Sequence, residues 1–346
     1  MYRTKHIGMC VKSIEGRGGI QKNYLLWFRM FRKRGVEVTL YVLERTTVQE
    51  DGIIYLEGDS LERKKRSLAS YLKENVYDLF LLNAEYMKPV LKMYHQSYYI
   101  TVHNTWEIKG WLWKRYKQRK RLEKKYLYEK LIGISESVLD NITDVLRIPV
   151  QSKTVIYAPH DFESVRHLST KIVLDEPLIV AVGSLIRRKN YQMLIEAYRH
   201  IENKIPHKLF IIGDGEDRSR LEKLVEQYGL TERIVFIGYE KNPYPYISQA
   251  SLLVSASLSE GLPRVIVEAL ILHTPVVTTY ASKGIDEVMI GELSEFIVKS
   301  YDSNLFAKTI LKALEDYPQI TEEYYQKFSE EFGYQSFLRL MQHDRG

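Results

Sequence analysis

Residues 259–270 have the sequence SEGLPRVIVEAL, and this stretch decides how the chain is interpreted. Glu260 falls in the loop after a strand-like run at 252–255, and Glu268 falls in the first turns of the helix that follows. The N–H groups at such a helix start can bind an anion. Either carboxylate could accept hydrogen bonds from a sugar or ribose diol. Capping and solvation produce the same spacing, so the stretch alone leaves both interpretations open.

Around this stretch, short strand-like runs alternate with helical patterns in both halves of the chain. The alternation predicts parallel strands with crossover helices, and therefore two doubly wound α/β sheets in tandem. Their ligands are expected in a cleft beyond the carboxyl ends of the strands. The predicted strands are 6–11, 36–43, 77–82, 98–102, 131–134 and 154–157 in the first half, and 178–182, 208–212, 233–237, 252–255 and 275–279 in the second. Helices are predicted at 20–34, 61–74 and 111–129, and an aromatic-rich one at 321–343.

The composition is that of a globular protein, with 45% hydrophobic and 27% charged residues. It contains no apolar run of about 18 residues that could span a bilayer, and the first residues lack the pattern of a secretory signal. The one cysteine, Cys10, is expected to be a buried apolar residue of the first strand. We therefore expect a cytoplasmic protein, peripheral at the inner face of the membrane.

The charge is distributed unevenly between the halves. Residues 1–165 carry 29 Lys and Arg against 19 Asp and Glu, whereas residues 166–346 carry 21 against 25, so the net charges are +10 and −4. The segment 109–130 combines ten of these cations with two Trp and three Tyr residues. This mixture is typical of a helix at an anionic membrane surface. Nucleic-acid binding and a solvated face with ordinary core aromatics remain alternatives.

Three further loops follow predicted strands of the second half. The first, Gly183-Ser184-Leu185-Ile186-Arg187-Arg188-Lys189, brings three consecutive cations to the end of a strand. Because clustered cations repel one another, a pyrophosphate nearby would stabilise them. The other two loops contain Gly213-Asp214-Gly215 and Gly238, where glycine allows a close approach of backbone to a base or ribose. A solvated basic loop is the alternative for the first of them.

Taken in order, these segments closely resemble the pattern of glycosyltransferase family 4. The resemblance covers roughly residues 178–290 and rests on Val-Gly-Ser-Leu-(x)3-Lys189-Asn, Ile-Gly-Asp-Gly-Glu, Phe-Ile-Gly-Tyr, Ser-x-x-Glu260-Gly-Leu-Pro-x-x-x-x-Glu268-Ala and Pro275-Val-Val-Thr-Thr. The first half is compatible with it. Arg17-Gly18-Gly19-Ile20 stands where the family has its glycine loop against the donor phosphate, and His103 ends a strand in the matching place.

The resemblance implies a retaining GT-B enzyme with two Rossmann-like domains facing across a cleft. It implies that Lys189 contacts the donor diphosphate, Glu260 the sugar hydroxyls, Glu268 the ribose and His103 the sugar from the other domain. His103, Glu260 and Lys189 are then the catalytic candidates. The implied donor-binding residues are Gly18, Gly19, Gly183, Ser184, Arg188, Lys189, Gly213, Gly215, Glu260, Gly261, Leu262 and Glu268.

One position departs from the family pattern. Many relatives have arginine directly after the glycine of the first loop, where this chain has Ser184, and we expect Arg187 or Arg188 to supply the missing charge. The acids Asp214, Glu216 and Asp217 stand at a turn and a helix start, where acids are favoured. We therefore expect no metal site there and no cofactor. Ser135 is expected to cap a helix.

The function expected is transfer of a hexose or N-acetylhexosamine from a nucleotide donor, a UDP-sugar, to a surface-glycan, lipopolysaccharide or lipid-linked saccharide acceptor. The alternatives are a GT-B sugar-nucleotide epimerase and a basic nucleic-acid-binding module. The expected division is an acceptor-binding domain at 1–168, a nucleotide-sugar-binding domain at 169–320 and a helix at 321–346 that packs across the junction.

Overall fold

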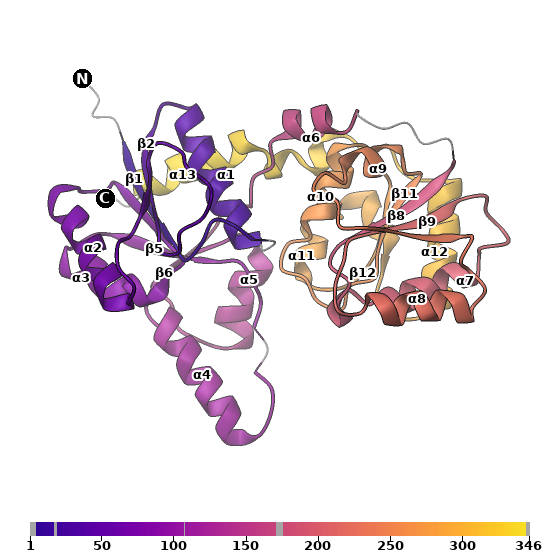
Figure 1. Ribbon diagram of the computed structural model, residues 1–346, viewed down its shortest axis with the longest axis horizontal. Helices are drawn as coiled ribbons and strands as arrows, with labels where there is room; N and C mark the ends of the chain where they lie inside the picture. Colours follow the sequence, from indigo (N-terminus) through magenta and orange to yellow (C-terminus); the bar gives the residue numbers. More distant parts are fainter. Residues whose placement is uncertain (1–4, 17–18, 107, 171–175, 344–346) are drawn as a thin grey trace. The chain divides into compact units, whose positions relative to one another are not determined.

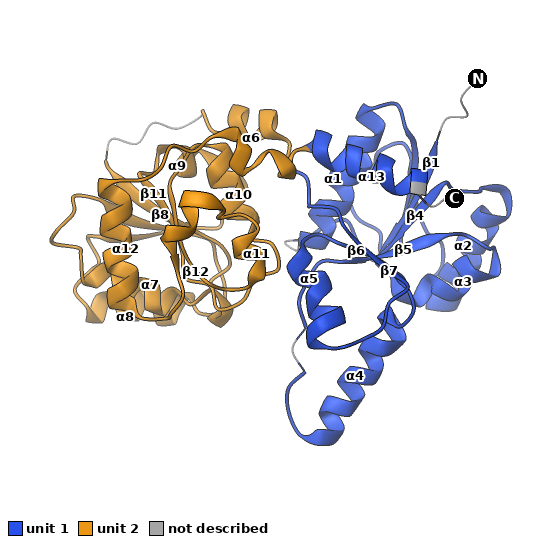
Figure 2. Ribbon diagram, turned by 180° about the vertical axis from the view of Figure 1, so that it is seen from behind, with its two compact units in different colours: residues 1–159, 330–346 blue, residues 160–329 orange. Residues whose placement is uncertain are grey.

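The computed structural model describes residues 5–16, 19–106, 108–170 and 176–343. The chain divides into two compact units (Figures 1 and 2). Unit 1 consists of Met1–Pro159 and Glu330–Gly346, and unit 2 of His160–Ser329. Each unit is built on one parallel sheet with helices packed against it.

Unit 1 contains a seven-stranded sheet with the order β3-β2-β1-β4-β5-β6-β7. All of its strand pairs are parallel. The strands are β1 (His6–Val11), β2 (Glu37–Val42), β3 (Ile53–Tyr55), β4 (Leu79–Leu82), β5 (Tyr98–Val102), β6 (Lys130–Gly133) and β7 (Ser152–Val155). Strands covered on both faces need continuous apolar runs, and every residue of β4, with the sequence LFLL, is buried. Cys10 in β1 is fully buried, as predicted, and burial raises the pKa of its thiol.

The helices of unit 1 are α1 (Gly19–Lys33), α2 (Leu61–Glu74), α3 (Lys88–Met93), α4 (Leu112–Tyr126), α5 (Glu136–Asp140) and α13 (Glu330–His343). Helix α1 packs with its apolar face inward, whereas only Leu122 and Tyr126 of α4 are buried. Helix α13 comes from the end of the chain and packs on α1, where the Phe337 ring lies 5.6 Å from that of Trp27 and 5.1 Å from that of Phe31. At the surface, Arg34, which directly follows α1, pairs with Glu331 of α13 at 3.0 Å. The end of the chain therefore completes the core of unit 1.

Unit 2 contains a six-stranded parallel sheet with the order β10-β9-β8-β11-β12-β13. Its strands are β8 (Leu178–Val182), β9 (Lys208–Ile212), β10 (Ile234–Gly238), β11 (Leu252–Ser255), β12 (Val276–Thr279) and β13 (Ile297–Val298). Its helices are α6 (Phe162–Leu168), α7 (Tyr191–Arg199), α8 (Arg218–Gln227), α9 (Tyr244–Gln249), α10 (Arg264–Ile271), α11 (Lys283–Asp286) and α12 (Ser303–Glu315). The order reverses between β8 and β11, and this reversal places the loops after these two strands next to each other.

The division between the units differs from the expected boundaries. It falls after Pro159 rather than after residue 168, because α6 packs on α9 and α10 of unit 2. The expected helix at 321–343 is also divided. Two short 3-10 turns, Glu322–Tyr324 and Gln326–Phe328, precede α13, and His160 N–H donates to the Phe328 carbonyl at 2.8 Å within unit 2. Strands β3 and β13, which are three and two residues long, were not predicted.

A helix that crosses a bilayer needs about 20 mostly apolar residues. Among the helices of the described residues, none is both long enough and apolar enough to cross a membrane.

Candidate active site

Two loops meet at the point where the strand order of unit 2 reverses. Strands β8 and β11 are hydrogen-bonded neighbours, and the loops at their carboxyl ends hold the predicted cations and Glu260 respectively. The loops are joined by the Leu258 N–H, which donates to the Arg188 carbonyl at 2.8 Å. Parallel sheets bind ligands at such a reversal. The topology therefore explains why residues about 70 positions apart in the sequence share one site.

Glu260 lies at the centre of this site. Its carboxylate accepts a hydrogen bond from the Lys189 ammonium through Oε1, and Oε2 lies 3.4 Å from the Arg188 guanidinium. Arg188 also donates to the Ser259 carbonyl at 2.7 Å. The Glu260 side chain is only 10% exposed, whereas that of Arg188 is half exposed. The structure thus brings together Arg188, Lys189 and Glu260, with one half-buried cation beside the carboxylate and one more exposed cation facing solvent.

Arg188 and Lys189 are presented by a tight turn. The turn Arg187–Lys189 is a 3-10 helix that ends at Asn190, whose backbone is left-handed with φ of 51°, and α7 begins directly after it. The Tyr191 hydroxyl donates to the Gly183 carbonyl at 3.0 Å and holds the start of the loop. Burial and the nearby Glu260 charge raise the pKa of Tyr191, so this hydroxyl keeps its proton. Arg187 is exposed and lies outside this group of contacts.

The glycines of the second loop have a packing role. A Cβ on Gly213 would lie 1.9 Å from the Gly183 carbonyl oxygen, and one on Gly215 would lie 2.4 Å from that of Leu185. Gly213 also has φ of 143°, which L side chains rarely adopt. Both glycines therefore make room for the loop that carries the cations. Whether they also contact a base or ribose, as predicted, stays a prediction.

Glu268 lies on α10, the helix that begins after the Glu260 loop. Pro263 caps this helix without a side-chain hydrogen bond, so its first N–H groups have no acceptor within the helix. The Glu268 Oε1 lies 3.5 Å from the Tyr244 hydroxyl and 3.9 Å from both Arg264 Nε and His160 Nε2. Burial and the Glu268 charge raise the pKa of Tyr244. A half-buried carboxylate among donors is suited to bind the hydroxyls of a ribose.

His103 directly follows β5 in unit 1, as predicted. Its Nδ1 lies 3.2 Å from Asn23 Nδ2 and its Nε2 lies 3.1 Å from Thr101 Oγ1. Because an amide NH2 only donates, Nδ1 accepts and Nε2 carries the proton. Burial and the Lys125 charge lower the pKa of His103 to about 3, so the ring is neutral at pH 7. A sugar hydroxyl would bind this ring by replacing one of the two contacts.

The other predicted residues are placed as follows. Gly18 lies outside the described residues, and Gly19 begins α1, close to the carboxyl end of β1. Ser184 is exposed, Leu262 is buried with its side chain in the core, and Gly261 has its carbonyl 2.0 Å from where a Cβ on Gly284 would stand. Ser135 caps α5, as predicted, by accepting from the Val138 N–H at 3.3 Å.

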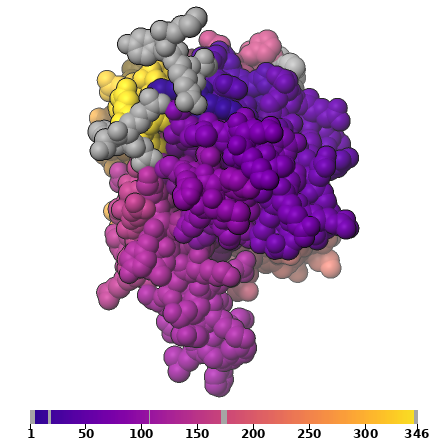
Figure 3. Space-filling view, turned by 90° about the vertical axis from the view of Figure 1, so that its left-hand side faces the viewer, coloured from indigo at the N-terminus to yellow at the C-terminus, as the bar shows by residue number. Residues whose placement is uncertain are grey.

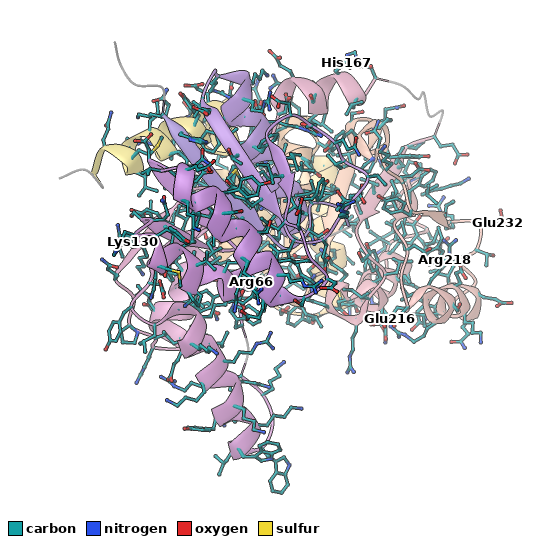
Figure 4. The ribbon with its side chains drawn as sticks, turned by 60° about the vertical axis from the view of Figure 1, so that its left-hand side comes forward. Arg66, Lys130, His167, Glu216, Arg218 and Glu232 are labelled. Carbon is teal, nitrogen blue, oxygen red and sulfur yellow. The ribbon has the colours of Figure 1, made fainter. Side chains whose placement is uncertain are left out.

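Asp214, Glu216 and Asp217 lie before α8, where Figure 4 marks Glu216 and Arg218. Asp214 accepts from the Gly215 N–H at 2.8 Å, and Asp217 pairs with Arg220 at 3.4 Å. Within the described ranges, no group of three or more His, Cys, Asp or Glu residues could hold a metal ion. Asp214 therefore stabilises the turn, and Asp217 pairs within the first turn of α8.

Three residues of these sites were missed by sequence reasoning. Asn23 fixes the orientation of His103, and its only signal is a polar residue on the apolar face of α1. Tyr244 and His160 reach Glu268 from segments 24 and 108 positions away. Nothing in the local sequence links them to that carboxylate.

A separate pocket of about 580 Å³ lies in unit 1 along β7 and α13. Figure 4 labels Lys130, the first residue of β6, which is one of its lining residues. The full lining is Tyr99, Lys130, Gln151, Ser152, Thr154, Val155, Ser336, Arg339 and Leu340. None of the predicted site residues belongs to it.

Comparison with known proteins finds relatives of this chain among glycosyltransferases. Residues 166–332 match the family of glycosyl transferases group 1. An uncharacterized glycosyltransferase of Methanocaldococcus jannaschii is 29% identical over 49% of this chain and 48% of the relative. The N-acetylgalactosamine-N,N'-diacetylbacillosaminyl-diphospho-undecaprenol 4-alpha-N-acetylgalactosaminyltransferase of Campylobacter jejuni is 27% identical over 55% and 53%. The chain thus spans about half the length of the curated relatives it matches.

The fold is shared over a longer stretch. The crystal structure of Anabaena HepE in complex with UDP-glucose matches with a TM-score of 0.78 and 17% identity, over 98% of this chain and 99% of that one. The two parallel-sheet units therefore form the GT-B fold, which confirms the predicted fold class. The stretch that matches the group 1 glycosyl transferases, residues 166–332, contains Lys189, Glu260 and Glu268.

Proposed function

We propose that this protein is a retaining glycosyltransferase that moves a hexose or N-acetylhexosamine from a UDP-sugar to a surface-glycan, lipopolysaccharide or lipid-linked saccharide. The observation that carries the proposal is the convergence of Lys189 and Arg188 on Glu260, between neighbouring strands and beside the start of α10. Opposite charges held half-buried at a strand-order reversal are suited to a ligand with both a diphosphate and hydroxyl groups.

The donor diphosphate binds Lys189 and Arg188. Glu260 keeps these two cations together and offsets their mutual repulsion. When the diphosphate arrives, it takes over the cations, and the Glu260 carboxylate becomes available for the sugar hydroxyls. The first N–H groups of α10 add a further attraction for the anion. Arg188 thereby replaces the arginine that many relatives have at the position of Ser184.

The ribose binds Glu268, whose carboxylate accepts from the two vicinal hydroxyls. The contact of His103 with the donor sugar stays a prediction. The choice of UDP is supported by the solved complex of HepE with UDP-glucose. A lipid-linked saccharide acceptor is supported by the name of the Campylobacter jejuni relative, which acts on a diphospho-undecaprenol saccharide.

In the reaction, the bond between the anomeric carbon and the diphosphate oxygen breaks, and a bond to the acceptor oxygen forms on the same face. The proton of the acceptor hydroxyl leaves with the diphosphate. Negative charge therefore grows on the leaving group, where Lys189, Arg188 and the backbone dipoles stabilise it. These groups belong to the chain itself, so we expect turnover to persist when EDTA removes divalent metal.

Unit 1 provides the acceptor side and the contact with the membrane. Its basic helix α4 is expected to bind anionic vesicles at low salt and to release them as the salt concentration rises. Co-sedimentation that does not distinguish anionic from neutral vesicles would contradict this part of the proposal.

The test is a thermal-shift panel of nucleotide sugars followed by product analysis. A ligand of the native state raises the melting temperature, and the best donor should raise it most. With an acceptor present, that donor should release UDP. Conversion of the UDP-sugar without acceptor and without UDP release would instead indicate an epimerase, and a panel without any shift would contradict a donor site.

A further inference from the structure

The N-terminal end of helix α4 carries the largest exposed apolar side chains of unit 1. Trp111, Leu112 and Trp113 are 85%, 84% and 64% exposed, and Tyr116 follows one turn later at 62%. Helix α4 projects from the rest of unit 1 (Figures 1 and 3), and its side chains stand out around it in Figure 4. Folded proteins rarely leave two Trp and a Leu in water next to one another without a partner for them.

Because of how these residues are arranged, a partner that lies flat along the side of α4 could not bury all of them. Trp111 caps the helix, and Leu112 and Trp113 are its first two residues. Successive helical residues are about 100° apart around the axis, so three in a row surround the end of the helix rather than forming a stripe along it. Only an end-on approach buries all three. We call residues 111–113 the α4 tip.

The opposite end of α4 is fixed to unit 1. Leu122 and Tyr126 are buried, and the Lys88 ammonium donates to the carbonyls of Lys124 and Lys125 at 2.8 and 3.0 Å. Lys88 also pairs with Glu129 at 3.0 Å. Burial opposes the ionisation of Glu129, but its hydrogen bonds outweigh this effect and lower the pKa of the carboxyl. The helix is therefore held at its base and presents its tip to solvent.

Cations surround the helix behind the tip. Between residues 108 and 126 the sequence has nine Lys and Arg against one acid, Glu123, which pairs with Arg119 and Lys120 at 2.9 Å. The Lys117 ammonium lies 4.3 Å from the centre of the Trp113 ring. Long cationic side chains can reach lipid phosphates while aromatic rings enter the headgroup region.

We propose that the α4 tip inserts end-on into an anionic bilayer, with the cations behind it against the headgroups. The charge complementarity favours an anionic lipid surface, and the tip supplies apolar contact that salt does not screen. This inference deepens the proposed function, because it assigns the surface by which unit 1 reaches a lipid-linked acceptor. It does not depend on the identity of the donor.

The test compares two variants in vesicles containing phosphatidylglycerol. Replacing the tip residues in Trp111→Ser/Leu112→Ser should weaken partitioning about tenfold or more, because most of the inserted apolar area is lost. The matched control is Tyr128→Asn, which removes an aromatic side chain that is 70% exposed at the other end of the helix. Its left-handed backbone, with φ of 56°, suits Asn, and partitioning should stay within about twofold of the wild type.

Depth is measured by quenching of tryptophan fluorescence with brominated phospholipids. The wild type should be quenched, whereas Trp111→Phe/Trp113→Phe should bind but lose most of the quenching, because the remaining Trp27 is fully buried in unit 1 and Trp106 is partly buried. The inference is overturned if Tyr128→Asn weakens vesicle binding as much as the tip variant does, or if the tip variant binds vesicles normally. It is also overturned if the tip variant loses binding only to single-stranded DNA and not to vesicles. The thermal shift with UDP is recorded for every variant, so failure of the donor site remains distinguishable.

Discussion

The two units share a parallel-sheet plan but differ in how their cations are arranged. In unit 2, Lys189 and Arg188 converge on the buried Glu260, where two neighbouring strands end. In unit 1, the cations of α4 are spread along a helix that projects into solvent, while His103 at the end of β5 is buried and neutral. Convergent charges suit a small ligand of high charge density, whereas spread charges suit an extended anionic surface.

The charges of the two units should also respond differently to salt. A charge beside a buried partner is screened little by salt, whereas the charges on α4 face solvent and are screened strongly. Donor binding should therefore depend on single side chains of unit 2. Attachment through unit 1 should depend on ionic strength and on the α4 tip.

The largest effect is expected from Lys189→Ala. Removing this half-buried cation leaves Glu260 without its closest partner and takes away a group that stabilises the leaving diphosphate, so kcat should fall about 100-fold. The measurement is the rate of UDP release at saturating donor. Lys223→Ala removes an exposed cation of α8 in the same unit and should leave the rate unchanged. Equal rates of UDP release in both variants would contradict the role assigned to Lys189.

We expect Glu268 to contribute mainly to donor binding and Glu260 mainly to turnover. Glu268→Gln weakens the hydrogen bonds to the ribose and should raise the donor Kd about tenfold with a smaller change in kcat. Glu260→Gln should instead lower kcat by a similar factor with a smaller change in Kd. Titration calorimetry and steady-state rates measure the two quantities. Glu226→Gln on the exposed face of α8 serves as the control, and negligible effects from both site variants would remove the assigned roles.

In unit 1, the buried His103 should make stability depend on pH. Its pKa of about 3 lies below the ordinary value of about 6.5, so the unfolded chain binds the proton first as the pH falls. The free energy of unfolding should therefore decrease below pH 6.5 by about 1.4 kcal/mol per pH unit from this residue. Urea unfolding of wild type and His103→Asn between pH 7 and 5 should give a shallower slope in the variant. His167→Asn, at an exposed position of α6, should keep the wild-type slope.

The smallest effect is expected from Arg188→Ala, because this side chain is half exposed. The donor Kd should rise about fivefold, in line with a screened charge-assisted contact. Arg187→Ala should change it less than about twofold, since Arg187 lies outside the contacts around Glu260. The reverse order, measured by the same calorimetry, would assign the missing arginine charge to Arg187.

The sequence was sufficient to predict two parallel sheets and to bring Lys189 and Glu260 to one edge, because each motif follows a strand and the carboxyl ends of parallel strands meet there. It was insufficient where contacts join distant segments. The approach of Tyr244 and His160 to Glu268 depends on the packing of α6 and α9, and the return of the chain to unit 1 depends on Phe337 between Trp27 and Phe31. Strand β13 has two residues, too few to show a pattern.

The most direct test of the central claim, that unit 2 holds the donor at Lys189, Glu260 and Glu268, is calorimetric titration of the full chain with UDP. We predict that wild type and Lys223→Ala bind with the same affinity, and that Lys189→Ala and Glu268→Gln each bind about tenfold more weakly. Equal affinity in all four proteins, or no binding to the wild type, would contradict the claim.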